Sequence, residues 1–212
     1  MGLARGCARL VNDAGFGRRY VFGENFENDT SLACVDLLVR AIVELSLRFL
    51  PSMVKRRTRG ILDVGSTACY QPVPYTSIYA ASKAFILSWF PAIREKNRHC
   101  DTGVRIAQVV PGVTETNLDG QGHSERRGPI EWVCVDNPAD VTRVAVDALM
   151  GNAAAKVVGW NNRAFHAGMN VLPDSAKAML VSTSHGVPRR RASREVGHRM
   201  SVLSHENQGN QV

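Results

Sequence analysis

The residues best suited to acid–base chemistry in this sequence are Tyr79 and Lys83, which stand four positions apart. Residues four apart share one face of a helix, so the Lys83 ammonium is expected near the Tyr79 phenol. A free tyrosine has a pKa of about 10. A nearby cation favours the phenolate, which brings Tyr79 closer to use as an acid or base near neutral pH. Ser66 follows an apolar run and could donate a hydrogen bond to a substrate oxygen.

Short apolar runs predict the strands that position these residues. The runs lie at residues 8–11, 61–64 and 104–110, with a last short strand at Val157 and Val158. Nearly continuous apolar strands that alternate with helices indicate an α/β fold, in which helices cover the faces of a parallel sheet.

Apolar residues at helical spacing predict a long amphipathic helix over residues 31–54, with a bend at Pro51. A second helix is predicted from near Ser77 into the 90s. Asn137-Pro138 begins a third, which ends at about Met150, because asparagine is a good N-cap and proline suits the first helical position.

Three segments follow the predicted strands at their carboxyl ends, where open parallel sheets bind ligands: residues 12–15, Ser66 and residues 111–116. Each feature also has a plainer interpretation in isolation. Tyr79 fits a half-buried helix residue, Ser66 a cap of a helix or turn, and Pro111-Gly112 the end of a strand.

The composition suits one globular domain: 212 residues, 44% hydrophobic and 21% charged. No run of about eighteen apolar residues exists, so no membrane span is predicted. The first residues lack the apolar stretch of a secretory signal, which predicts a cytoplasmic protein. The five cysteines form no C-x-x-C pair and the six histidines show no ligand spacing, so neither a disulfide framework nor a metal site is predicted.

The net charge of +7 belongs to two clusters. Lys55, Arg56, Arg57 and Arg59 follow the long predicted helix, where cations favour the helix C-terminus. Residues 186–200 carry five Arg and one Glu, in a stretch that predicts a mobile basic tail. The rest of the chain is nearly neutral, and the tail lacks interleaved aromatic residues, so specific nucleic-acid binding is not expected.

In order and spacing, the segments resemble the short-chain dehydrogenase/reductase family over roughly residues 8–165. The matching residues are Asn12, Ala14 and Gly15, residues 39–41, Gly65, Ser66 and Thr67, Tyr79 with Lys83, and Pro111, Gly112, Thr114 and Thr116. The resemblance implies a partial, Rossmann-like, doubly wound parallel sheet that binds NAD(P) over residues 1–165. Residues 166–212 would form a C-terminal helix or loop and a disordered basic tail.

The resemblance also implies an oxidoreductase that uses NAD or NADP to interconvert a small-molecule alcohol and a carbonyl. Tyr79 would donate or accept the proton, Ser66 would orient the oxygen, and Lys83 would hold the nicotinamide ribose and lower the pKa of Tyr79. Residues 111–116 would pass along the nicotinamide, while residues 12–15 would lie near the adenosine half and support the sheet. Family dimers imply a homo-oligomer formed through residues 36–54 and 77–90.

Several residues depart from the family pattern. The sequence contains no T-G-x-x-x-G-x-G turn for the pyrophosphate, and the residue that selects NAD or NADP belongs to the same missing region. Leu38 stands where the family has an asparagine that holds a relay water. Asp63 stands in a strand where an amide is common, and a buried carboxylate there would need a partner or a proton. Pro91 costs about 3 kcal/mol inside the second helix unless that helix ends or kinks.

These departures suggest a truncated or decaying family member, or an incomplete gene model. The alternative function is therefore a catalytically inactive relative that serves as an interaction module. We also expect the first strand to leave an unpaired sheet edge with exposed apolar residues, which favours aggregation or self-association.

Overall fold

A parallel sheet forms the centre of the molecule. The computed structural model describes residues 9–17, 28–57, 60–114, 135–151 and 154–184. In this part of the chain, four parallel strands lie in the order β1-β2-β3-β6. Their bounds are Arg9–Asn12 (β1), Gly60–Val64 (β2), Arg105–Val110 (β3) and Lys156–Val157 (β6). A second small sheet pairs β4 (Val113–Thr114) with β5 (Val135–Asp136). The predicted α/β fold with a parallel sheet is confirmed.

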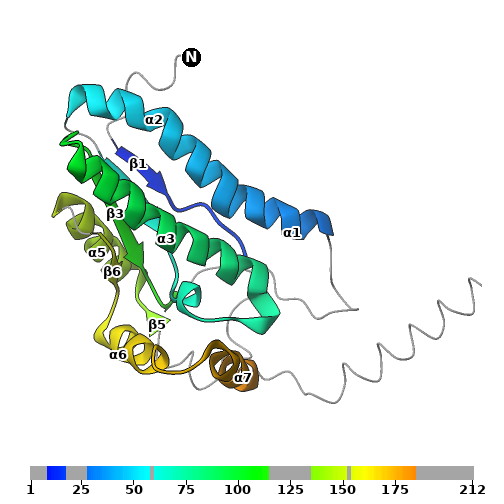
Figure 1. Ribbon diagram of the computed structural model, residues 1–212. Helices are drawn as coiled ribbons and strands as arrows, with labels where there is room; N and C mark the ends of the chain where they lie inside the picture. Colours follow the sequence, from blue (N-terminus) through cyan, green and yellow to red (C-terminus); the bar gives the residue numbers. More distant parts are fainter. Residues whose placement is uncertain (1–8, 18–27, 58–59, 115–134, 152–153, 185–212) are drawn as a thin grey trace, which may run out of the picture.

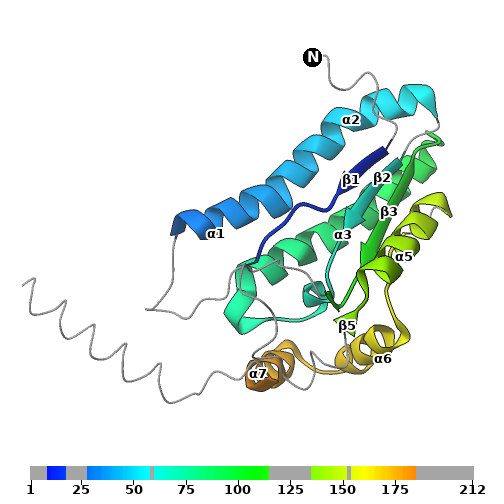
Figure 2. The ribbon, with the colours of Figure 1, turned by 180° about the vertical axis from the view of Figure 1, so that it is seen from behind.

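Helices cover both faces of this sheet. The helices are α1 (Asn28–Val35), α2 (Ile42–Arg56), α3 (Ser77–His99), α5 (Pro138–Met150), α6 (Trp160–Met169) and α7 (Asp174–Ser184). Two short 3₁₀ turns, η3 (Thr67–Tyr70) and η4 (Pro74–Thr76), connect β2 to α3. Figures 1 and 2 show α2 and α3 on one face, α5 on the other, and α6 and α7 beyond the carboxyl ends of the strands.

Buried side chains alternate between the two faces along the strands. Ile61 and Ile106 are partners in register and pack with Met53, Ile86 and Phe90 of the helices α2 and α3. The opposite face packs against α5 through a second cluster: Leu62, Ala107, Val109, Ala145, Ala148, Leu149 and Val158. The core therefore fixes α3 against the same strands whose ends carry the candidate site residues.

The long predicted helix is present but contains a π-helical segment. Residues of α1, η2 (Asp36–Ala41) and α2 follow one another without a gap from Asn28 to Arg56. The segment η2 holds the fully buried Leu38. The apolar periodicity did not predict this π-helical segment. Pro51 lies further along the chain, inside α2. Lys55 and Arg56 do occupy the last turn of α2, as the charge pattern predicted.

Helix α3 continues through Pro91 to His99, so the proline does not end the helix. Ile86 and Phe90 are both fully buried on the same helix. Burial of such a side chain contributes about 1.5–3 kcal/mol. Two of them offset the roughly 3 kcal/mol cost of an internal proline.

The first strand is an edge of the sheet. Within the described residues β1 pairs only with β2, and Val11 is 53% exposed. The predicted unpaired edge with an exposed apolar side chain is confirmed for this part of the chain, whereas self-association stays a prediction. Helix α6 runs across the predicted domain boundary after residue 165. Residues 185–212, which contain the predicted basic tail, lie outside the described residues. No described helix combines the length and apolar character needed to cross a membrane.

The core packing predicts a large difference between two phenylalanines of α3. Phe90 is fully buried, whereas Phe85 is 48% exposed. Phe90→Ala should lower the free energy of unfolding by about 3–5 kcal/mol, because it leaves a cavity in the core. Phe85→Ala should cost about 1 kcal/mol or less. Urea unfolding measures both variants, and equal losses would contradict this orientation of α3.

Candidate active site

Tyr79 and Lys83 lie together on α3, as their spacing predicted. The Lys83 Nζ atom is 5.9 Å from the centroid of the Tyr79 ring. The Lys83 side chain is only 5% exposed, and its ammonium donates a hydrogen bond to the carbonyl oxygen of Val64 at 2.6 Å. Val64 is the last residue of β2. Helix α3 is thus connected to the end of the strand that leads to Ser66.

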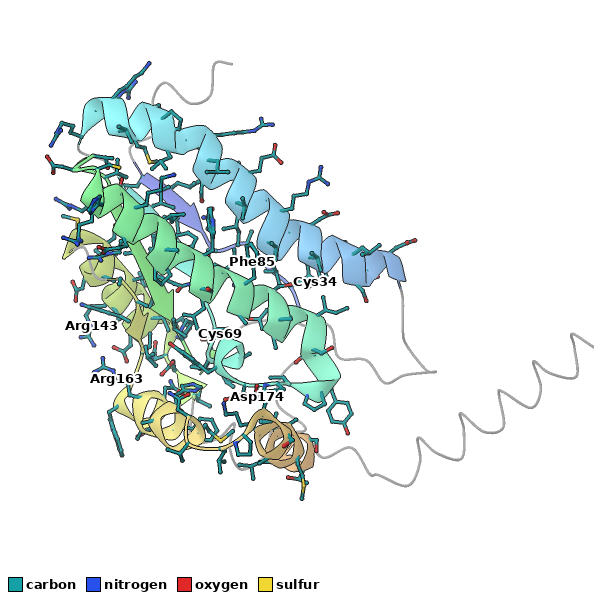
Figure 3. All side chains as sticks on the ribbon, in the orientation of Figure 1. Cys34, Cys69, Phe85, Arg143, Arg163 and Asp174 are labelled. Carbon is teal, nitrogen blue, oxygen red and sulfur yellow. The ribbon has the colours of Figure 1, made fainter. Side chains whose placement is uncertain are left out.

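Electrostatics around Lys83 involve groups from four segments. Burial lowers the pKa of Lys83, and the carboxylates of Asp63 and Asp13 act in the opposite direction, as do the thiols of Cys69 and Cys34. Figure 3 shows Cys34 on α1 and Cys69 on η3 at opposite sides of α3. Burial raises the pKa of Cys69 to about 12, so this thiol stays protonated and is a poor nucleophile.

Ser66 caps η3 at the end of β2. Its Oγ atom accepts a hydrogen bond from the Ala68 N–H at 3.2 Å, which matches the plainer interpretation of this serine. A hydroxyl that accepts through its oxygen still has its hydrogen to donate. The capping role therefore leaves Ser66 able to bind a substrate oxygen.

The segment after β3 is joined directly to the Ser66 segment. The Thr67 N–H donates to the Pro111 carbonyl at 2.8 Å, and the Gly65 N–H donates to the Val109 carbonyl at 2.7 Å. Thr114 donates through Oγ1 to the Gly112 carbonyl at 3.3 Å. Thr116, the last residue of the predicted nicotinamide segment, lies outside the described residues.

A buried carboxylate that sequence reasoning missed fixes this segment. Oδ2 of Asp136 accepts hydrogen bonds from the Gly112 N–H at 2.6 Å and from Nδ2 of Asn162 at 2.9 Å. Burial raises the pKa of Asp136, while these two hydrogen bonds act in the opposite direction. The hydrogen bonds of Asp136 join residues far apart in the chain, so they leave no pattern in the sequence. The only sequence signal was an acidic residue directly before the Asn137 cap.

The residues after β1 divide between the core and the surface. Asn12 is buried and donates through Nδ2 to the Ser46 Oγ atom at 3.4 Å, beneath α2. Ala14 is exposed. Gly15 packs against Leu38, because a Cβ added at Gly15 would stand 2.8 Å from the Leu38 Cδ2 atom. The placement of Asn12 agrees with support of the sheet, while its role toward a cofactor stays a prediction.

Gly17 is a further residue that the motifs did not reveal. A Cβ added there would lie 3.1 Å from Cδ2 of Tyr79, so the glycine backbone packs against the tyrosine ring. The neighbouring Phe16 carbonyl accepts a hydrogen bond from the Cys34 thiol at 3.4 Å. The segment after β1 therefore helps to fix the position of the Tyr79 ring.

His166 lies in an apolar and aromatic environment beside η3. It is 5% exposed, and its ring centroid is 4.4 Å from that of Tyr70. Within the described segments, neither ring nitrogen has a hydrogen-bond partner. Burial lowers the pKa of His166 to about 4, so the ring is neutral at pH 7. In the described part of the chain, no three His, Cys, Asp or Glu residues gather as metal ligands.

The contact between Gly17 and Tyr79 gives a prediction about ring position. Gly17→Ala should displace the Tyr79 ring, because the new methyl group meets it at 3.1 Å. Gly168→Ala is the matched control, since nothing lies within 4 Å of its added Cβ. NMR spectra of ring-labelled tyrosine should show a shifted Tyr79 signal in the first variant only. An unchanged Tyr79 signal in Gly17→Ala would refute the contact.

Burial of neutral His166 predicts a loss of stability in acid. Its pKa is about 4 in the folded protein and about 6.5 in an unfolded chain. Between these two pH values only the unfolded state takes up the proton. The free energy of unfolding therefore decreases as the pH falls from 6.5 toward 4. Urea unfolding at pH 7.5 and 5 should therefore show a smaller acid loss in His166→Phe than in the wild type. Equal losses in both proteins would show that His166 is not buried as a neutral ring.

Known proteins share both the sequence pattern and the fold. A sequence model described as short chain dehydrogenase matches residues 6–127, which is more than half of the chain. The chain is 29% identical over 153 residues to the ketoacyl reductase HetN of Nostoc sp. This alignment covers 72% of this chain and 51% of that protein. It is 30% identical over 113 residues to sulfoacetaldehyde reductase 2 of Chromohalobacter salexigens, covering 51% of this chain and 43% of that protein. The chain thus spans about half the length of these curated relatives.

Solved structures show the same fold at lower sequence identity. A 7beta-hydroxysteroid dehydrogenase aligns with a TM-score of 0.70 and 16% identity, over 82% of this chain and 67% of that one. A short-chain dehydrogenase from Sphingobium yanoikuyae in complex with NADPH aligns with a TM-score of 0.65 and 19% identity, over 89% of this chain and 70% of that one. The 3-ketoacyl-(acyl-carrier-protein) reductase from Brucella melitensis complexed with NADH aligns with a TM-score of 0.60 and 23% identity, over 71% of this chain and 65% of that one. With the match of the family model, the order of the segments and the Tyr79–Lys83 geometry, the chain belongs to the short-chain dehydrogenase family of oxidoreductases.

Proposed function

We propose that the protein is an NAD(P)-dependent oxidoreductase that interconverts an alcohol and a carbonyl, with Tyr79 as the acid and base. The observation that carries this proposal is the position of Lys83. Its ammonium lies beside the Tyr79 ring and binds the Val64 carbonyl, two residues before Ser66. A hydroxyl donor, a phenol and a cation therefore come from adjoining segments at one end of the sheet.

The three side chains have separate tasks in proton transfer. The Ser66 hydroxyl donates a hydrogen bond to the substrate oxygen and orients it. Tyr79 gives its proton to that oxygen during reduction and takes it back during oxidation. The Lys83 ammonium stabilises the negative charge that Tyr79 carries after it has given up the proton.

The residues present fit the nicotinamide and ribose part of the cofactor. An ammonium has three N–H donors. Within the described part of the chain, the hydrogen bond of Lys83 to Val64 uses one, which leaves two donors for ribose hydroxyls. Pro111, Gly112 and Thr114 follow β3 beside Ser66, where they would line the nicotinamide. Asn12, Ala14 and Gly15 would lie on the adenosine side. When bound, the cofactor supplies the hydride.

The substrate class follows from the chemistry of the relatives. A ketoacyl reductase and a sulfoacetaldehyde reductase, by their names, reduce a ketone and an aldehyde. We infer a small-molecule carbonyl as the oxidised substrate of this chain. A homo-oligomer in the cytoplasm remains the assembly and location that the sequence predicts.

The test uses the purified 212-residue chain. NADH and NADPH binding is followed by fluorescence titration, and reduction of a panel of aldehydes and ketones by the loss of NAD(P)H absorbance. Tyr79→Phe should lower kcat by about 10²–10⁴-fold, the usual contribution of acid–base catalysis, while cofactor binding persists. Tyr75→Phe removes a phenol outside the proposed site and should retain activity. No saturable binding up to millimolar cofactor would overturn the proposal and favour the inactive relative. Full activity in Tyr79→Phe would overturn the role of Tyr79 as the acid and base.

A further inference from the structure

A row of buried polar side chains crosses the sheet beneath α2 and α3. Asn12, Asp63 and Gln108 are partners in register on β1, β2 and β3. All three are buried, and Asp63 and Gln108 are fully so. Asn12 bonds to Ser46 of α2, and Ile61, two residues before Asp63, packs against α3. The row therefore lies on the side of the sheet from which Lys83 approaches.

Asp63 has too few hydrogen bonds for an isolated buried carboxylate. Its Oδ2 atom accepts from Nε2 of Gln108 at 2.8 Å, while its Oδ1 atom has no hydrogen-bond partner among the residues that the structure describes. Removing a carboxylate from water carries a large cost unless a charge or several donors compensate. Asp63 therefore needs a nearby cation whenever it is ionised.

Lys83 is the cation that meets this requirement. Its ammonium bonds to the carbonyl of Val64, the residue that follows Asp63. Among the titratable groups, Asp63 has the largest effect on the pKa of Lys83, ahead of Asp13 after β1, Cys69 on η3 and Cys34 on α1. Lys83 in turn has the largest effect of any charged group on the pKa of Asp63. Each group is the principal charge in the surroundings of the other.

We propose that Asp63 is the counter-ion of Lys83, a positioning residue that keeps the ammonium charged and directed toward Tyr79. Helix η2, which packs beside α3, contributes the fully buried apolar side chain of Leu38. The charge balance of the site comes instead from the strand below it. The catalytic consequence rests on the proposed function, whereas the coupling of the two charges does not.

The pairing gives the site a pH dependence with a defined direction. Burial raises the pKa of Asp63 to about 6, against the opposing effects of Lys83 and Gln108. Above pH 6 the carboxylate is ionised and compensates the Lys83 charge. As the pH falls through about 6, Asp63 takes up a proton and this compensation is lost.

The coupling is tested without any enzyme assay. Side-chain NMR of ¹⁵N-labelled lysine follows the titration of Lys83, whose signal is assigned by its loss in Lys83→Met. In Asp63→Asn, which keeps the shape and removes the charge, Lys83 should titrate about one pH unit or more lower. Asp136→Asn, the matched variant at another buried carboxylate, should leave the titration of Lys83 unchanged. An unchanged Lys83 titration in Asp63→Asn overturns the proposal.

The reciprocal experiment covers the case in which Asp63→Asn does not fold. Thermodynamic linkage requires the charge of Lys83 to change the pKa of Asp63 by as much as the charge of Asp63 changes the pKa of Lys83. ¹³C NMR of the Asp63 carboxyl in Lys83→Met should therefore show a midpoint above the wild-type value of about 6. The same midpoint in both proteins overturns the proposal.

Activity measurements separate this inference from the proposed function. If the chain reduces carbonyls, the acid limb of its kcat/KM profile near pH 6 should disappear or move in Asp63→Asn. An unmoved limb together with an unchanged Lys83 titration rejects the counter-ion while the oxidoreductase stands. If no carbonyl is reduced but the Lys83 titration shifts, the counter-ion stands and the proposed function fails.

Discussion

The Lys83 ammonium stays between α3 and the sheet because the Val64 carbonyl accepts its hydrogen bond. A buried ammonium needs such acceptors and a compensating charge, since the protein interior replaces its hydration poorly. This requirement connects the helix that carries Tyr79 to the end of the strand that leads to Ser66. Apolar packing of Ile86 and Phe90 supplies the energy that keeps the same helix on the sheet. The core thus determines where α3 lies, and Lys83 determines which polar groups meet there.

Buried polar contacts also join the loops around this point. The Thr67 N–H bonds to Pro111, and Asp136 accepts from Gly112 and Asn162. A buried carboxylate that receives several hydrogen bonds is compensated for its lost hydration. In the described part of the chain Asp63 receives a single one, from Gln108, and so its ionised form depends on a nearby charge. The two aspartates therefore have different tasks: Asp136 holds a loop, whereas Asp63 balances a cation.

Patterns with a short range in the sequence predicted most of the fold and the centre of the site. Apolar runs located β1, β2, β3 and β6, and the four-residue spacing brought Tyr79 and Lys83 together. The π-helical segment at Leu38, the packing of Gly17 on Tyr79 and the Asp136–Asn162 bond were not predicted. Each depends on contacts between segments far apart in the chain, for which a single sequence carries no period. Pro91 shows the same limit, because tertiary burial of its neighbours outweighs a local helix-breaking preference.

The whole site depends on the burial of Lys83, which lysine acetylation followed by mass spectrometry can measure. Lys96 lies on the same helix and is exposed, so it is the internal reference. In the native protein Lys96 should be acetylated rapidly, while Lys83 should remain unmodified until the protein is unfolded in urea. Acetylation of both lysines at the same rate under native conditions would contradict the buried ammonium and the site that depends on it.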